Sequence, residues 1–162
     1  VERGLGVHAP HRTVLRVSLG MVRIGDVVRA GMAGAMLSGV PSTVHALATR
    51  RDPLEGARAA GTLLLPRETR TLPLLAAATV AHLGISLGWA AVLRTVVPER
   101  NGAAWGALGG MAIAALDLGV IGRRFPRIHA LPVLPQVADH LAYGAVVGAF
   151  PRSRPSAGTS TR

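Results

Sequence analysis

Four long runs almost free of charge alternate with short arginine-bearing stretches along this chain. The runs cover residues 30–49, 71–93, 101–122 and 128–150, and arginine flanks each of them. A helix needs about 20 apolar residues to cross the roughly 30 Å of hydrocarbon in a membrane. Backbone groups find no water in lipid, so a segment of this length inside it is helical. The pattern predicts an all-α polytopic membrane protein with four transmembrane helices in an antiparallel bundle, spanning about 30–49, 72–94, 102–122 and 132–150.

The stretch between the first two spans carries the signature of a helix start. Asp52 and Glu55 flank Pro53, in the order of an N-cap acid, a proline at the first helical position and a reciprocal acid. We therefore predict a short interfacial helix over about 53–64, with Arg58 facing water or lipid headgroups.

The two ends of the chain differ from the spans. Residues 1–24 have no clean apolar periodicity and form a leader, and Met21 is an alternative start of the protein. A cleaved secretory signal is a competing interpretation, because Ala46-Leu47-Ala48 fits the small-x-small cleavage pattern. The tail, residues 151–162, is rich in Ser, Pro, Gly and Arg, which predicts disorder.

Composition supports the membrane interpretation and removes others. Of 162 residues, 49% are hydrophobic and 16% are charged, against about 25% charged in ordinary soluble domains. The net charge of +10 comes from 18 basic residues, all arginine, at the edges of the apolar runs. Guanidinium groups there meet lipid headgroups, which argues against a nucleic-acid partner. We expect a multi-pass protein of a bacterial cytoplasmic (inner) membrane, in contact with the lipid bilayer and with a membrane-protein partner or a second copy of itself.

Small residues recur at four-residue spacing in every predicted span. Such a strip lets the backbone of another helix approach closely, where no hydrophobic effect acts between helices. With 20 glycines, some pairs arise by chance, but the triple in the third span is harder to dismiss. We predict that the strips pack the bundle internally as glycine zippers, with dimerisation as the alternative. They are Gly31, Ala35 and Gly39; Gly84 and Gly88; Gly102, Gly106 and Gly110; and Gly144 and Gly148.

Ionisable side chains inside the predicted spans are the candidate site. A charge near the bilayer centre costs about 3 kcal/mol on insertion scales, so such groups usually face the bundle interior and have partners. In one interpretation they hydrogen-bond neighbouring helices; in the other they form a proton or ion site in which an Asp exchanges protons with a His. No metal or cofactor is expected, because no His-x3-His pair shares a helix face. The candidates are His45, His82, Asp117, Asp139 and His140.

One string resembles a catalytic motif. Residues 84–88 match G-x-S-x-G, the serine elbow of soluble hydrolases, and also look like the serine motif of rhomboid proteases. The hydrolase elbow needs a strand and a large α/β core, and rhomboids have at least six spans. We therefore predict no enzyme, and a packing role for Ser86 in which its hydroxyl bonds a carbonyl one turn back.

Three groups of short strings carry a resemblance. They are Ala33-Gly34 with Ser38-Gly39-Val40-Pro41-Ser42-Thr43, then Phe125-Pro126-Arg127, and then Ala138-Asp139-His140-Leu141-Ala142-Tyr143-Gly144. Over roughly residues 25–150 the chain resembles the small multi-span bacterial inner-membrane proteins of the YagU-like group. That resemblance implies a membrane fold and brings no established activity.

The function that we expect from the sequence is that of a non-enzymatic membrane component or partner subunit with structural intramembrane Asp and His pairs. The alternative is a small proton- or ion-coupled transporter that uses Asp117, Asp139, His82 and His140.

Overall fold

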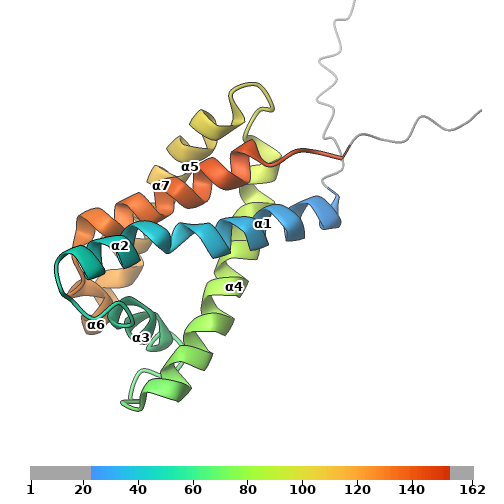
Figure 1. Ribbon diagram of the computed structural model, residues 1–162. Coiled ribbons are helices and arrows are strands. Elements are labelled where there is room, and N and C mark those ends of the chain that lie inside the picture. The colour runs from blue at the N-terminus through green and yellow to red at the C-terminus, as the bar shows by residue number, and fades with distance from the viewer. Residues whose placement is uncertain (1–22, 154–162) are drawn as a thin grey trace, which may run out of the picture.

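The computed structural model describes residues 23–153, and this part of the chain is helical with no strand (Figure 1). The predicted leader and Met21 lie outside the described residues, as do residues 154–162 of the tail. The elements are α1 (Ile24–Ser38), α2 (Val40–Ala48), α3 (Glu55–Gly61), α4 (Thr71–Val96), α5 (Gly102–Leu116), the π-helical η1 (Asp117–Ile121), the 3-10 turn η2 (Gly122–Arg124), α6 (Pro126–His129) and α7 (Val133–Ala149).

Within the described residues 23–153, two helices are long and apolar enough to cross a membrane. They are Thr71–Val96, with 26 residues, and the continuous helical segment Gly102–Arg124, with 23. Only 28% and 22% of their most apolar stretches are buried within the protein. The core helix of a soluble protein would be mostly buried, so this exposed apolar surface is compatible with lipid around both helices.

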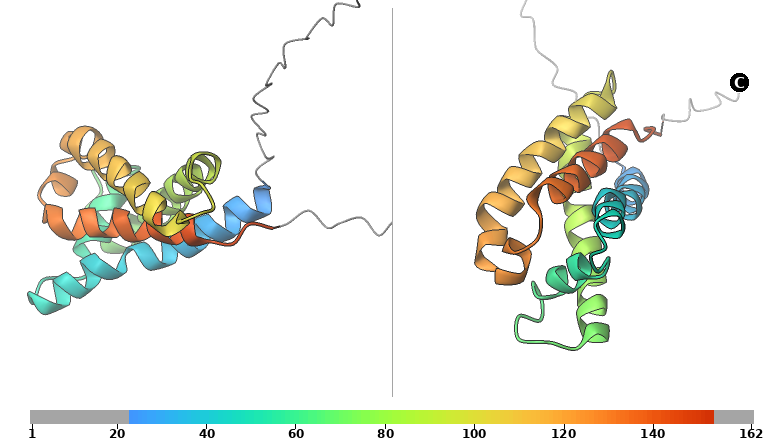
Figure 2. Two further views of the ribbon diagram at one scale, coloured as in Figure 1. Left: turned by 90° about the horizontal axis from the view of Figure 1, so that it is seen from above. Right: turned by 60° about the vertical axis from the view of Figure 1, so that its left-hand side comes forward.

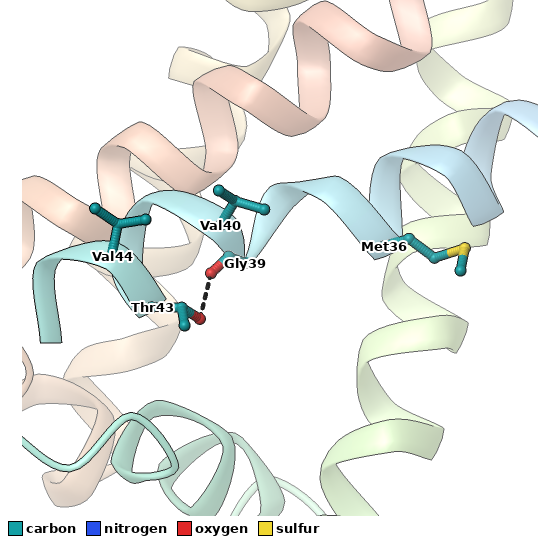
Figure 3. Close-up of a pocket in the computed structure, with 5 residues that line it drawn as sticks. All are labelled: Met36, Gly39, Val40, Thr43 and Val44. Atoms are coloured by element: carbon teal, nitrogen blue, oxygen red, sulfur yellow. Dashed lines mark hydrogen bonds between the residues drawn. The ribbon is translucent and has the colours of Figure 1, made fainter. Parts of the chain in front are cut away.

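The first predicted span consists of two helices that meet at Gly39. Pro41, the second residue of α2, has no N–H and cannot continue the hydrogen bonding of α1. Thr43 Oγ1 donates a hydrogen bond of 2.7 Å to the Gly39 carbonyl, which closes the first turn of α2 (Figure 3). A groove of about 270 Å³ beside this junction is lined by Met36, Gly39, Val40, Thr43 and Val44. Helix α1 also begins at Ile24, earlier than the predicted residue 30.

Helices α5 and α7 run antiparallel and touch through glycine (Figures 1 and 2). A Cβ atom on Gly106 would overlap the Gly144 carbonyl oxygen, and one on Gly144 would overlap that of Gly106. The same reciprocal relation joins Gly102 and Gly148, while Gly110 lies against the backbone of α7 near His140. The two backbones are therefore in direct contact over most of the length of both helices.

Helix α4 does not join a regular antiparallel bundle. It crosses the line of α1 and α2 at a wide angle, whereas α5 and α7 follow each other (Figures 1 and 2). At the crossing, a Cβ on Gly31 would meet the side chains of Leu87 and Ala90 at 3.0 and 3.1 Å. Helices that cross steeply separate on either side of their zone of contact. The antiparallel arrangement predicted from the sequence therefore describes α5 and α7 but not α4.

Several predicted packing residues contact nothing inside the described part of the chain. An added Cβ on Gly39, Gly84 or Gly88 would meet no atom within 4 Å, so these three do not pack residues 23–153 together. Helix α4 instead buries a different face, with Leu74, Ala77, Ala78, Ala81, Ala90 and Leu93. In α1, Ala35 is buried, and Gly34, which was not predicted, fits against Tyr143 and Val147 of α7.

The first loop holds a helix shorter than predicted. Helix α3 begins at Glu55, because the Asp52 carboxylate accepts the Leu54 N–H at 2.8 Å and fixes a turn ahead of the helix. The prediction that Arg58 faces water or headgroups did not include the ion pairs that it makes. Its side chain is 17% exposed and its guanidinium pairs with both Asp52 and Glu55. Helix α3 lies against the start of α4, where a Cβ on Gly61 would overlap the Leu74 backbone.

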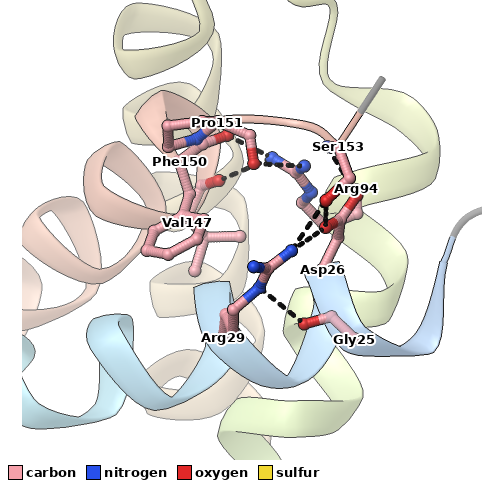
Figure 4. Close-up of polar contacts among 8 residues, drawn as sticks. All are labelled: Gly25, Asp26, Arg29, Arg94, Val147, Phe150, Pro151 and Ser153. Atoms are coloured by element: carbon pink, nitrogen blue, oxygen red, sulfur yellow. Dashed lines mark hydrogen bonds and ion pairs between the residues drawn. The ribbon is translucent and has the colours of Figure 1, made fainter. Parts of the chain in front are cut away.

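Polar contacts join three chain segments at one end of the molecule (Figure 4). The Asp26 carboxylate forms an ion pair of 2.6 Å with Arg29. It also accepts hydrogen bonds from the backbone N–H and from the hydroxyl group of Ser153. The hydrogen bonds from Ser153 and Arg29 hold the pKa of Asp26 far below its usual range. Residues 151–153 are thus ordered, although the whole tail was predicted to be disordered.

Two arginines cap helix ends at this same end of the molecule. Arg94 of α4 is almost fully buried and donates a 2.6 Å hydrogen bond to the Phe150 carbonyl, just past α7 (Figure 4). In return, Arg152 donates to the Val97 carbonyl just past α4 at 2.5 Å. Carbonyls at helix C-termini lack intrahelical partners, and guanidinium groups satisfy them while complementing the helix dipole.

Candidate functional site

A partly open cavity of about 1040 Å³ lies on the side of α4 that diverges from α1. Its wall comes from α2, α3, α4, η1 and α7, with single residues of α1, α5 and α6, namely Ser38, Ile113 and Ile128. All five ionisable residues that the sequence places inside the spans line it: His45, His82, Asp117, Asp139 and His140. Residues almost a hundred positions apart therefore meet around a single space.

Asp139 caps a helix in another part of the chain. Its Oδ1 accepts the backbone N–H of Ser42 at 2.9 Å. Ser42 is the third residue of α2, and the first N–H groups of a helix have no partner within that helix. A carboxylate at a helix N-terminus also interacts favourably with the helix dipole. The break at Gly39 and Pro41 thus creates a backbone donor that Asp139 of α7 satisfies.

His82 binds the other side of the same break. The N–H of Gly39 turns toward the Leu37 carbonyl, so it does not close the usual helical bond to Ala35. The Ala35 carbonyl instead lies 3.0 Å from His82 Nε2. A carbonyl only accepts, so Nε2 carries the proton. Helices α4 and α7 therefore each supply a side chain to the junction of α1 and α2.

The side chains of His140 and Asp117 lie within hydrogen-bond distance of each other, and one proton between them would complete a hydrogen bond. His140 Nδ1 lies 2.7 Å from the Gln136 carbonyl, so this nitrogen carries a hydrogen. Its Nε2 lies 3.4 Å from Asp117 Oδ2. With Nδ1 already protonated, a hydrogen bond between the two side chains needs a further proton on either Nε2 or the carboxyl group. This geometry is that of a donor and acceptor pair between α7 and η1.

The π-helical turn η1 begins at Asp117. Five residues in this widened turn continue α5, and the Gly122 N–H donates to the Asp117 carbonyl. Widened turns of this kind alter the direction of side chains along a helix and are frequent at functional sites. The single α-helical span predicted over 102–122 did not include this change.

Ion pairs hold the outer end of the cavity, where Arg51, Asp52 and Glu55 line it. Hydrogen bonds from Arg58 lower the pKa of both Asp52 and Glu55, and Arg127 lies 3.3 Å from Glu55. This last contact connects α3, which precedes α4, to α6, which precedes α7. Carboxylates beside guanidinium groups remain ionised well below neutral pH.

Some residues of the site were missed by the sequence analysis. The Tyr143 hydroxyl donates to the Ser86 carbonyl, so the contact of Ser86 across the helices is made by its backbone. The Ser42 N–H and the Gln136 carbonyl are backbone groups that no side-chain pattern reveals. The unpaired Ser42 N–H could have been inferred from Pro41, because a proline early in a helix marks a helix start, where N–H groups lack partners. Tyr143, one turn after Asp139 and His140, could have been found by helical spacing.

Within residues 23–153, no group of three or more His, Cys, Asp or Glu side chains is arranged to hold a metal ion. No family model, curated protein or solved structure matches this chain. The functional argument therefore rests on the cavity and on the hydrogen bonds around it.

Proposed function

We propose that the chain is a four-span protein of a bacterial cytoplasmic membrane, and that it acts as a non-enzymatic membrane component whose intramembrane Asp and His side chains hold the helices in register. The glycine contacts between α5 and α7 are its packing seam, in the manner of a glycine zipper. Its resemblance to the YagU-like group agrees with this proposal and adds no activity.

The observation that carries the proposal is the pair of bonds at the break between α1 and α2. Asp139 accepts the Ser42 N–H, and His82 donates to the Ala35 carbonyl. A backbone group that is buried without a hydrogen-bond partner costs about 1–3 kcal/mol in proteins, and lipid offers no water to replace the partner. Both side chains therefore have a structural task before any transport is considered.

The four-span topology is supported by the way the loops gather. Arg127 meets Glu55, which brings the first and third loops to one end of the molecule. Ser153 meets Asp26, and Arg152 meets Val97, which brings the start of α1, the second loop and the end of α7 to the other. This sorting is what four successive crossings of a bilayer require.

The first test is the thermal stability of Asp139 variants in lipid nanodiscs. Asp139→Asn retains a carbonyl oxygen that can accept the Ser42 N–H, so its unfolding temperature should stay near that of the native protein. Asp139→Ala leaves that donor unpaired and should lower the free energy of unfolding by about 1–3 kcal/mol. Glu99→Gln, on an exposed carboxylate, is the control. Equal stability of the Ala and Asn variants would contradict the structural role.

A second candidate function, proton-coupled transport, is favoured by the His140 and Asp117 pair. The pair faces the cavity and has a position for one exchangeable proton, as derived from the Gln136 contact. A transporter would use this proton while Asp139 and His82 maintain the junction of α1 and α2.

Proton flux driven by a pH gradient in proteoliposomes tests this second candidate. A transporter should lose flux in Asp117→Asn and in His140→Gln, with folding retained, and Glu99→Gln should conduct as the native protein does. Absence of flux in the native protein would reject the transport candidate and leave the structural proposal standing.

A further inference from the structure

The wall of the large cavity is divided into a polar and an apolar part. Its polar part holds His82 and Asp139, which bind the junction of α1 and α2. Ile85 and Trp89 lie three and seven residues beyond His82 on α4, and Ile113 of α5 joins them in the wall. At helical spacing these α4 side chains share one face with His82. A ligand with one polar group and one apolar body matches this division.

Beside Asp139, the hydrogen-bonding capacity left over consists of the acceptor positions of its carboxylate, whereas His45 and Trp89 elsewhere in the wall carry ring N–H groups that can donate. Ser42 supplies the hydrogen bonding that Asp139 receives within residues 23–153, chiefly through its N–H, although a carboxylate has room for about four hydrogen bonds. The ring N–H groups of His82 and His140 are already directed at the carbonyls of Ala35 and Gln136. A bound molecule would therefore have to bring donors to this part of the cavity.

The charges that line the cavity also favour a ligand that donates hydrogen bonds and carries positive charge. Asp117 and Asp139 line the inner cavity, while the one arginine among the described lining residues, Arg51, is exposed at the outer end next to Asp52. A carboxylate or phosphate ligand would meet like charge at Asp139. A protonated amine would instead form charge-assisted hydrogen bonds, which are roughly twice as strong as neutral ones.

We infer that this cavity binds small organic cations, in which an ammonium group donates to Asp139 and an apolar or aromatic body lies against Ile85, Trp89 and Ile113. This goes beyond the structural role proposed above, because Asp139 uses one acceptor position for Ser42 and offers the others to the ligand. The cavity of about 1040 Å³ exceeds the size of such a molecule, so water accompanies it.

Fluorescence of Trp89 reports the binding directly. The chain has two tryptophans, and Trp105 is half exposed and is not among the lining residues, so Trp105→Phe leaves one reporter inside the cavity. Three matched probes are titrated into this variant in nanodiscs at about pH 8, where unperturbed histidine is neutral. They are 2-phenylethylamine, 2-phenylethanol and phenylacetate, which share one aromatic body and differ in charge.

The inference predicts that 2-phenylethylamine changes Trp89 fluorescence saturably, and that the alcohol and the acid bind at least about 10-fold more weakly. Asp139→Asn should weaken amine binding by at least about 10-fold and leave alcohol binding unchanged, while Glu99→Gln should bind as the parent does. Equal binding of all three probes, or binding of none, would overturn the inference. Should Asp139→Asn fail to fold, the charge preference of the parent protein decides alone.

Discussion

Asp139 and His82 illustrate what a sequence reveals about polar residues in apolar helical segments and what it leaves out. Their place in apolar runs could be predicted from spacing alone, and so could a shared cavity with Asp117 and His140 as a hypothesis. Their partners could not, because these are backbone groups of Ser42 and Ala35. Such groups become available only where Gly39 and Pro41 interrupt a helix, and the sequence analysis treated that region as one continuous span.

Arg94 is the residue whose environment the sequence describes least well. Because Arg94 stands at the end of an apolar run, the sequence predicts that it lies among lipid headgroups. In the structure, the Arg94 side chain is buried and donates to a carbonyl just beyond α7. The reason is tertiary, since α4 and α7 end side by side at this point. Of the partner segment, Phe150 was assigned to the end of the fourth predicted span and residues 151–153 to a disordered tail.

Replacement of Arg94 by Met should destabilise the protein. The change preserves much of the apolar stem but leaves the Phe150 carbonyl without its donor, and hydrogen bonds to charged groups are worth about 1.5–3 kcal/mol. Arg100→Met, at an exposed position of the second loop, is the matched control. Thermal unfolding in nanodiscs gives the measurement, and an unchanged midpoint for Arg94→Met would contradict the capping role.

At the scale of elements, the seam between α5 and α7 was partly predictable. The glycine spacing in both segments indicates close approach, and these are the faces that touch. The same spacing at Gly84 and Gly88 leads to no contact within residues 23–153. Spacing identifies a smooth strip on a helix, but the crossing of α4 with α1 decides which face of α4 is buried.

Valine substitutions separate these two classes of glycine. Gly106→Val places a branched side chain where the Gly144 carbonyl already lies and should force α5 and α7 apart, with a loss of several kcal/mol, about 3 or more. Gly88→Val, with no neighbouring atom within 4 Å, should change the unfolding midpoint little. A comparable loss in both variants would mean that the α4 strip packs against something beyond this chain.

The start of α4 should loosen in acid. Glu68 accepts a hydrogen bond from the Arg70 guanidinium and from the backbone N–H groups of Arg70 and Thr69, which lowers its pKa to about 2. A lowered pKa stabilises the fold above the unfolded value of 4.5, and this stabilisation is lost as pH falls toward about 2. Hydrogen exchange in residues 68–75, corrected for intrinsic rates, should therefore accelerate below about pH 4. In Glu68→Gln, the exchange rate of residues 68–75 should no longer depend on pH in this range. If the acceleration in acid persists in this variant, another titrating group causes it.

At the scale of the whole molecule, helical content and the two long apolar segments Thr71–Val96 and Gly102–Arg124 follow from hydropathy, while the break at Gly39 and the angles between helices do not. The wide crossing of α4 creates the cavity of about 1040 Å³ and brings His45 and Asp117 to the same space as His82, Asp139 and His140. Hydropathy records how apolar each segment is, and contains no information on the direction in which two helices cross.

Cysteine accessibility tests the central claim, the four-span topology, most directly. The chain has no cysteine, so single cysteines at Ile24, Arg67, Arg100 and Ala130, all exposed, can be labelled with a membrane-impermeant maleimide in oriented vesicles. We predict that positions 24 and 100 react from one side of the membrane and positions 67 and 130 from the other. Labelling of all four positions from the same side, or of 67 and 130 from opposite sides, would contradict this account.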